Sequence, residues 1–358
     1  MGKELTYILG AGASFQSIPI VKSFNSRLSK FSLYLNDRET QKTNLKERYR
    51  KFTRAINVFN SLIQEFGAHQ SFDTYFKKFF HFGNEEKINQ GKRLLHLYFL
   101  WEHSVSSLNY NNEIKDGDFT KQSLFDKRYD ALIAGLLKPV AAKSEPICNL
   151  NFITWNYDIN LLNSIKNFFY SKLTFAKFLQ EIRQDEFIWN IDNKIKIINV
   201  NGYFYSSKFN SSTDLIGLNI DDIIDEKIEN NYFDESSVDE DADKIRFAWE
   251  LNEKDENNLK RSLSELIDKS DDIIIIGYTF PVYNRFIDLG YLKQDFVAKK
   301  SIVIQDPNAD ILKQTLNDVY RLNGKSKINT ISNCDSFYLP SSIFGINEYR
   351  IPFGVSVA

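Results

Sequence analysis

The residues best suited to chemistry stand directly after apolar runs of strand length. The run 5–9 is followed by a turn of small residues, Gly10-Ala11-Gly12-Ala13-Ser14. Small residues let backbone N–H groups approach a phosphate closely, and the start of a helix would add its partial positive charge. A tight turn between a strand and a helix also needs small residues for steric reasons, so a phosphate site and a purely structural turn both remain open.

A second apolar run, 150–155, is followed by Asn156 and Asp158. In open α/β sheets ligands bind beyond the carboxyl ends of the strands, so these two polar side chains are expected over the same crevice as the glycine turn. Asp158 could equally serve only as the cap of the helix that follows it.

Strands and helices alternate along the chain, and this alternation must position both groups. The strand-like runs are continuous and apolar, which is typical of strands buried on both faces of a parallel sheet. The pattern predicts an α/β protein, a Rossmann-like doubly wound parallel sheet with an inserted helical block. Strands are predicted at 5–9, 150–155, 195–200, 272–276, 301–304 and weakly near Ile328, and helices at 158–170, 255–268 and 283–292.

Residues 1–358 are predicted to form a single domain with two distinctive segments. From 44 to 140 apolar residues recur three and four apart, which predicts an inserted helical subdomain. The apolar side chains there are more than one buried face of each helix could hold. We therefore expect this block to form much of an oligomer interface, with core packing as the rival explanation. The acidic segment 221–243 is expected to be an exposed loop.

Composition limits the classes of partner. Net charge is −2, with 26% charged and 42% hydrophobic residues, so nothing draws the chain to nucleic acid, and no apolar run reaches membrane length. The two cysteines, Cys148 and Cys334, cannot supply the four thiolates of a structural zinc site. We therefore expect a cytoplasmic protein that holds no metal and contacts neither membrane nor nucleic acid directly.

Four motifs in a fixed order carry a family resemblance. They are Gly10 to Ser14, then Thr154-Trp155-Asn156-Tyr157-Asp158, then Asn201-Gly202 after a strand, then Gly277-Tyr278-Thr279-Phe280-Pro281. Together they resemble the sirtuin family, and within it the sirtuin-like domains of bacterial anti-phage defence systems. The likeness covers about residues 4–335 and is carried by the order of short motifs and their places at strand ends.

The resemblance implies roles for these residues around NAD. Gly10, Ala11, Gly12, Ala13 and Ser14 would lie on the phosphates, and Asn156 and Asp158 would line the nicotinamide ribose pocket. Gly277, Tyr278, Thr279 and Phe280 would line the adenosine side, and Asp306 would lie near the adenine ribose.

Two departures from the family pattern matter. The zinc-binding cysteine quartet of protein deacetylases is missing, which makes protein deacylation the weakest hypothesis. The family's catalytic histidine is matched by Asn201, and an asparagine cannot accept a proton near neutral pH. The four histidines, His69, His81, His96 and His103, all lie in the predicted helical block, and any of them could replace the missing base.

The leading hypothesis is an NAD glycohydrolase that acts as an anti-phage defence effector. Asn156 would orient water or a ribose hydroxyl, Asp158 would favour positive charge on the sugar, and Asn201 would supply hydrogen bonds. The principal alternative, suggested by Asn201, is a catalytically silent nucleotide-binding or scaffold subunit of a defence complex. In either case we expect a homo-oligomer, a separately encoded sensor subunit, or both.

Overall fold

The computed structural model gives the chain as a mixed α/β protein built on one large sheet. It describes residues 3–40, 46–67, 69, 71–111, 119–140, 143–185, 187–210, 214–230, 232, 240–292, 300–322 and 327–344.

The large sheet has seven strands in the order β5-β6-β4-β1-β7-β8-β9, and all neighbours pair in parallel except β5 with β6. Counted along the chain, the six parallel strands follow the spatial order 3-2-1-4-5-6, which is compatible with a Rossmann-like fold. The strands are β1 (Glu4–Leu9), β4 (Asn149–Thr154), β5 (Ile188–Ile191), β6 (Ile195–Asn199), β7 (Asp272–Ile276), β8 (Ser301–Gln305) and β9 (Lys327–Ile331). The six strands expected from the sequence are therefore confirmed.

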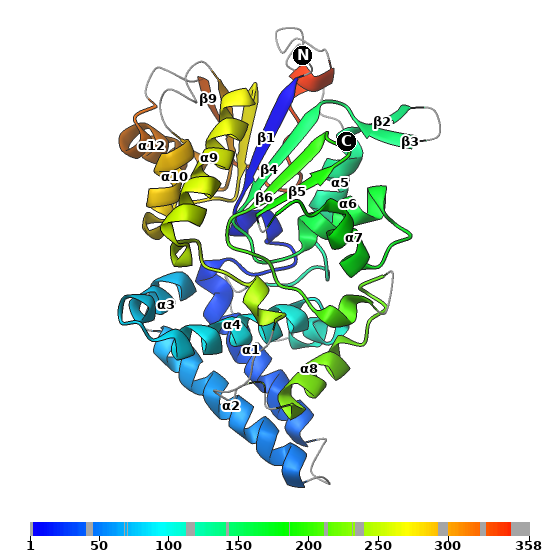
Figure 1. The fold of residues 1–358 in the computed structure, drawn as a ribbon, viewed down its shortest axis with the longest axis vertical. Helices are drawn as coiled ribbons and strands as arrows, with labels where there is room; N and C mark the ends of the chain where they lie inside the picture. The colour runs from blue at the N-terminus through cyan, green and yellow to red at the C-terminus, as the bar shows by residue number, and fades with distance from the viewer. Residues whose placement is uncertain are drawn as a thin grey trace.

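Helices flank both faces of the sheet, and each face has its own apolar core. In β1, Leu5, Tyr7 and Leu9 pack into one core while Ile8 packs into the other, because successive strand residues point to opposite faces. Figure 1 shows one set of helices on each side. They are α5 (Lys127–Gly135), α6 (Asn160–Phe169) and α7 (Phe175–Ile182) on one side, and α9 (Glu253–Lys269), α10 (Arg285–Tyr291) and α12 (Ala309–Tyr320) on the other.

A second group of helices gathers beyond one end of the sheet (Figure 1). It consists of α1 (Val21–Thr40), α2 (Lys46–Gly67), α3 (Phe72–His81), α4 (Glu85–Glu102) and α8 (Ile220–Glu229). Its interior is aromatic: the Trp101 ring lies 5.3 Å from that of Phe31 and 5.9 Å from that of Tyr34. These helices therefore enclose one shared core.

The prediction of an inserted block at 44–140 needs correction in two respects. The helix group also includes α1 and α8, whereas α5 packs on α6 beside the sheet and strand β2 (Leu137–Val140) pairs with β3 (Lys143–Pro146). Most aromatic side chains of the block are buried within the chain, so their number does not indicate an interface. Several helix faces are covered at once because five helices share the core.

The acidic segment 221–243 is also not one loop. Its first part lies in α8, where Ile220, Ile223, Ile224 and Ile228 are buried at helical spacing and outweigh the acidic composition. Residues 231 and 233–239 lie outside the described residues. None of the described helices is long and apolar enough to cross a membrane.

Candidate functional site

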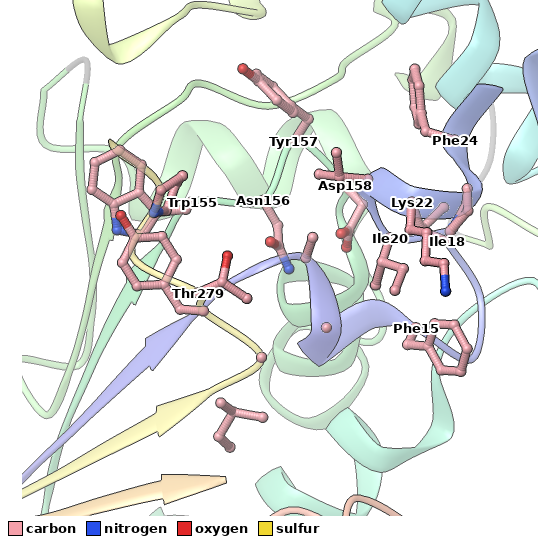
Figure 2. Close-up of a pocket in the computed structure, with 18 of the residues that line it drawn as sticks. Phe15, Ile18, Ile20, Lys22, Phe24, Trp155, Asn156, Tyr157, Asp158 and Thr279 are labelled. Atoms are coloured by element: carbon pink, nitrogen blue, oxygen red, sulfur yellow. The ribbon is translucent and has the colours of Figure 1, made fainter. Parts of the chain in front are cut away.

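A cavity of about 460 Å³ lies where β1, β4, β7 and β8 end, between the sheet and the helix group. The strand order reverses between β1 and β7, which is where open α/β sheets leave a crevice for ligands. Nine residues singled out from the sequence line it: Ala11, Gly12, Asn156, Asp158, Asn201, Gly277, Tyr278, Thr279 and Asp306. Figure 2 shows Asn156 and Thr279 at this space, with Asp158, Lys22 and Phe15 farther toward the other side of the view.

Four predicted cofactor-binding residues do not line the cavity: Gly10, Ala13, Ser14 and Phe280. Ala13 and Ser14 are fully buried, because the turn after β1 rolls into a short 3₁₀ helix (Ala11–Ser14) whose far side faces the core. Phe280 packs its ring into the core beside Tyr278. These residues support the wall of the cavity from behind, and their contact with a cofactor stays a prediction.

The segments that follow β1 and β7 cross at their glycines, with the two backbones in close contact. The Gly12 N–H donates to the Gly277 carbonyl at 3.0 Å, and a Cβ on Gly12 would lie only 2.8 Å from the Gly277 Cα. A Cβ on Gly10 would lie 2.5 Å from the Gly277 oxygen. Gly277 itself has φ +60°, a left-handed conformation that favours glycine. The glycines are therefore required by the crossing, and a side chain on Gly12 would strike the protein before it reached any phosphate.

Asn156 presents one end of its amide to the cavity. Its Nδ2 donates to Ser14 Oγ at 3.2 Å, and its backbone N–H donates to Thr154 Oγ1 at 3.1 Å. Its Oδ1 accepts no hydrogen bond from the described residues, although the side chain is only 6% exposed. The fixed amide thus leaves one acceptor available to a sugar hydroxyl or to water.

Asp158 serves both roles that the sequence left open. It lines the cavity, and its Oδ1 accepts from the Asn160 backbone N–H at 2.9 Å and from Asn160 Nδ2 at 2.7 Å. Burial raises the pKa of Asp158 above its usual value, while the bonds from Asn160 and Ser14 oppose the rise. One side chain therefore both fixes the start of α6 and brings a carboxylate to the cavity.

Asn201 is held by the backbone at both ends of its amide. Its Nδ2 donates to the Trp155 carbonyl at 2.8 Å, and its Oδ1 accepts from the Ala248 N–H at 3.3 Å. The side chain thereby joins the end of β4 to the segment after residue 245. None of the four histidines lines the cavity, and His96 and His103 are buried in the helix group. No histidine therefore takes the place of Asn201.

The chain matches no family model, no curated protein and no solved structure. The function must therefore be argued from the cavity itself. Within the described part of the chain, no three His, Cys, Asp or Glu side chains are grouped so as to hold a metal ion, and both cysteines are free.

Asp73 is a cavity residue to which sequence reasoning gave no role in the site. It lies in the first turn of α3, and the Tyr157 hydroxyl donates to its Oδ1 at 3.0 Å. Tyr283 also hydrogen-bonds to it. Burial raises the pKa of Asp73 to about 6, against the lowering effect of the two tyrosines and Lys77. From the sequence, Asp73 is expected to be a carboxylate on a helix surface or in a buried pair, in the helix that Ser71 caps.

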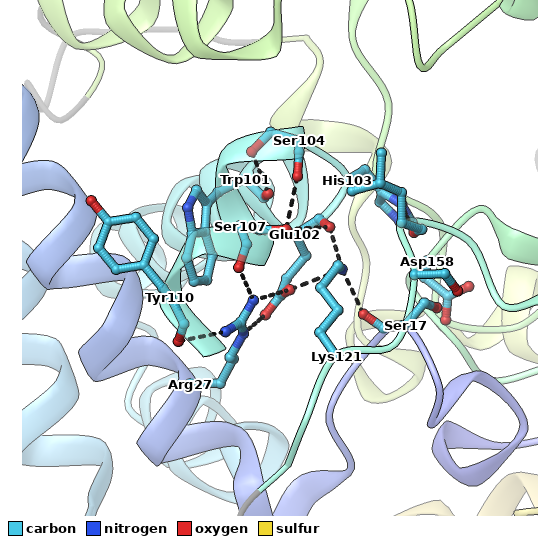
Figure 3. A network of polar contacts seen from close by, with 12 residues as sticks. Ser17, Arg27, Trp101, Glu102, His103, Ser104, Ser107, Tyr110, Lys121 and Asp158 are labelled. Carbon is cyan, nitrogen blue, oxygen red and sulfur yellow. Dashed lines mark hydrogen bonds and ion pairs between the residues drawn. The ribbon is translucent and has the colours of Figure 1, made fainter. Parts of the chain in front are cut away.

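A buried ionic network connects the helix group to the floor of the site (Figure 3). Arg27 binds Glu102 through Nε at 2.8 Å and Nη2 at 3.1 Å, and Lys121 Nζ reaches Glu102 Oε2 at 3.2 Å. Lys121 also donates to the Ser17 carbonyl at 2.7 Å, and Ser17 Oγ accepts from Asn160 at 2.9 Å. The network therefore ends on the residue that positions Asp158.

Two cations, Arg27 and Lys121, share the single carboxylate of Glu102 in this network. Burial alone would oppose ionisation of Glu102, but Lys121 and Arg27 outweigh it and lower the pKa of the carboxyl. Burial lowers the pKa of Lys121 to about 8. A buried charge left alone costs far more than a paired one, so the network can only be kept or lost as a unit.

Proposed function

We propose that this chain binds NAD in the cavity and hydrolyses it to nicotinamide and ADP-ribose. The observation that carries the proposal is the meeting of the glycine crossing with Asn156 and Asp158 at the reversal of strand order. In Rossmann-like sheets a dinucleotide lies across this point, with its phosphates over the first strand–helix turn. A volume of about 460 Å³ is within the usual range for a ligand pocket.

The lining suggests how the dinucleotide would lie. Ala11, in the turn after β1, and Lys22, in the first turn of α1, would face the phosphates. The start of a helix and a cation both favour negative charge. Asp306, at the end of β8, would face the adenine ribose, and Gly277 and Thr279 would border the adenosine. The nicotinamide ribose would lie against Asn156 and Asp158.

The reaction would rest mainly on placement and charge. Nicotinamide leaves as a neutral molecule while positive charge grows on the ribose, and a nearby carboxylate stabilises that charge. Asp158 would provide it, and the Asn156 oxygen would hold a hydroxyl or the attacking water. Asn201 contributes by holding the end of β4 in place rather than by moving a proton.

A silent nucleotide-binding subunit is the second candidate. It is favoured by one observation, that both ends of the Asn201 amide are occupied by backbone groups and can take no part in proton transfer. Such a protein would bind NAD without releasing nicotinamide.

We expect Asn156→Ala to abolish nicotinamide release and leave the fold intact, because the side chain is anchored by one bond to Ser14 and contributes little packing. Nicotinamide release, NAD affinity by calorimetry and melting temperature would be measured together. Asn163→Ala, on α6 and outside the cavity, is the matched control and should retain full activity. Binding without release in the natural chain would favour the silent subunit, and equal turnover in Asn156→Ala would remove Asn156 from the site.

In the cell, we propose that this activity depletes NAD as an anti-phage defence effector in the cytoplasm. The support is the resemblance to defence-type sirtuin-like domains, together with a cavity in the position it implies. We also propose that the active form is a homo-oligomer or a complex with a sensor subunit. Exposed Phe82, Val282 and Phe286 are candidate contacts for it, at 77%, 71% and 67% exposed.

A further inference from the structure

Among the described residues, three carboxylates line the cavity, and two of them already serve local structure. Asp158 accepts two hydrogen bonds from Asn160, and Asp306 accepts the Asn308 N–H at 2.8 Å, which fixes the start of α12. Asn201 is held by backbone, and no histidine reaches the space. The third carboxylate, Asp73, is held by the hydroxyls of Tyr157 and Tyr283 and also lines the cavity.

Asp73 lines the same cavity as the residues that would bind the ribose and is held by two tyrosine hydroxyls. Tyr157 donates to it, and Tyr157 stands in the chain between Asn156 and Asp158. The segment that carries the two ribose-binding side chains therefore also fixes Asp73. Tyr283, which follows β7, holds the carboxylate from a second direction. Elements on both sides of the cavity thus converge on one acidic group.

We propose that Asp73 is the catalytic base of the NAD hydrolysis proposed above, taking the place of the missing histidine. The bond between C1′ of the ribose and the pyridinium nitrogen breaks, and its electron pair leaves with neutral nicotinamide. A water oxygen bonds to C1′, and one of its protons passes to the Asp73 carboxylate and then to solvent. The step converts NAD and water into nicotinamide, ADP-ribose and one proton. This inference rests on the proposed function.

The electrostatics suit that role. The titratable and charged groups facing Asp73 are Tyr157, Tyr283 and Lys77. Burial raises the pKa of Asp73 to about 6 in their presence. The carboxyl is then mostly ionised at neutral pH, yet a far better proton acceptor than an ordinary aspartate, and the best catalytic bases have a pKa near the working pH.

The first test is Asp73→Asn, which keeps the size of the side chain and removes its basicity. We expect kcat to fall by about 10²–10⁴-fold, the usual contribution of a general base, with NAD affinity unchanged. A matched control is available outside the cavity: Asp221 accepts from the Tyr34 hydroxyl at 3.0 Å. Asp221→Asn and Tyr34→Phe should leave turnover as it is. Melting temperature separates loss of activity from loss of fold.

The second test is the pH profile, which a merely structural aspartate would not determine. In the natural chain kcat should fall as the pH is lowered, with an apparent pKa near 6. This acid limb of the pH profile should be absent in Asp73→Asn. Tyr157→Phe removes a donor that favours the ionised form, so the limb should move to higher pH. This variant retains Asp73 and stays informative even if Asp73→Asn does not fold.

The outcomes distinguish the two proposals. If the natural chain releases nicotinamide and Asp73→Asn does so equally fast, Asp73 is not the base, while the hydrolase survives. An acid limb that stays in place in Tyr157→Phe also overturns the assignment. If the natural chain binds NAD and never cleaves it, both the hydrolase and the base are wrong, and absence of binding rejects the nucleotide site itself.

Discussion

Asn201 shows how a single amide can be essential without entering the chemistry. Its two ends close a bridge between the Trp155 carbonyl and the Ala248 N–H, both within the protein interior. Asn201 therefore acts as a structural clamp on the surrounding backbone.

We expect Asn201→Ala to lower the free energy of unfolding markedly. The change leaves a buried carbonyl and a buried N–H without partners, and each such group costs about 1–3 kcal/mol. Asn199→Ala is the control, since Asn199 is also buried near the end of β6 but its Oδ1 has no partner among the described residues. Urea unfolding of the two variants gives the comparison. An equal loss of stability in both would mean that the clamp contributes little.

At the scale of elements, the glycine crossing joins β1 to β7 more tightly than strand pairing alone requires. We expect Gly277→Ala to be strongly destabilising. It combines a left-handed backbone, which costs a non-glycine residue about 1–2 kcal/mol, with a Cβ placed 2.4 Å from the Ala13 nitrogen.

Gly83→Ala is the matched control for that change. Gly83 has φ +65° and nothing within 4 Å of a Cβ, so only the backbone cost remains. Thermal melting of both variants should separate strain from collision. If the two variants melt at the same temperature, the glycine crossing has room for a side chain at Gly277, and the predicted collision does not occur.

The parallel strands could be predicted because most contain a short apolar run, the clearest of which is Ile273 to Ile276 in β7. Strand β5 was missed because its signal lies in the turn: Asp192 and Asn193 adopt φ of 49° and 56° and join β5 to β6 as a tight hairpin. The extent of the helix group was missed for another reason. Periodicity shows which faces of a helix are apolar but not which neighbour covers them.

For the site, sequence indicated the residues that follow strands and little else. Asn156, Asp158 and Gly277 could be placed because the carboxyl ends of parallel strands share an edge. Asp73 could not, since it reaches the cavity only through the packing of α3 over the sheet, and its partner Tyr157 lies 84 positions away. Contacts of that range leave no local pattern.

At the scale of the whole molecule, a buried acid makes stability depend on pH. Asp288 is fully buried and accepts from Tyr278, Tyr291 and Tyr320 at 2.8–3.2 Å. Burial nevertheless raises its pKa to about 7, above the value of about 3.9 in an unfolded chain. The folded state therefore holds a proton that the unfolded state releases, and this contribution to stability is lost as pH rises from about 4 to about 7.

We expect Asp288→Asn to remove that dependence. The difference in melting temperature, variant minus natural chain, should grow in favour of the variant between about pH 4 and about pH 7, the window between the unfolded and folded pKa values. Other buried groups titrate in the same range, but they cancel in the difference. Asp221→Asn, in a partly exposed pair, is the control. A difference that stays constant with pH would show that Asp288 is already ionised in the folded protein.

The position of β1 at the centre of the sheet also has a consequence for biosynthesis. Leu5 pairs with Leu150 on one side and with Asp272 on the other, the latter 267 positions along the chain. A ribosome adds about 5–20 residues per second, so the most deeply buried strand waits roughly 13–53 s before its second neighbour exists. During that interval the backbone N–H and C=O groups along that edge of β1 have no native partner. The order of the strands therefore leaves this edge open to pairing with other chains during synthesis.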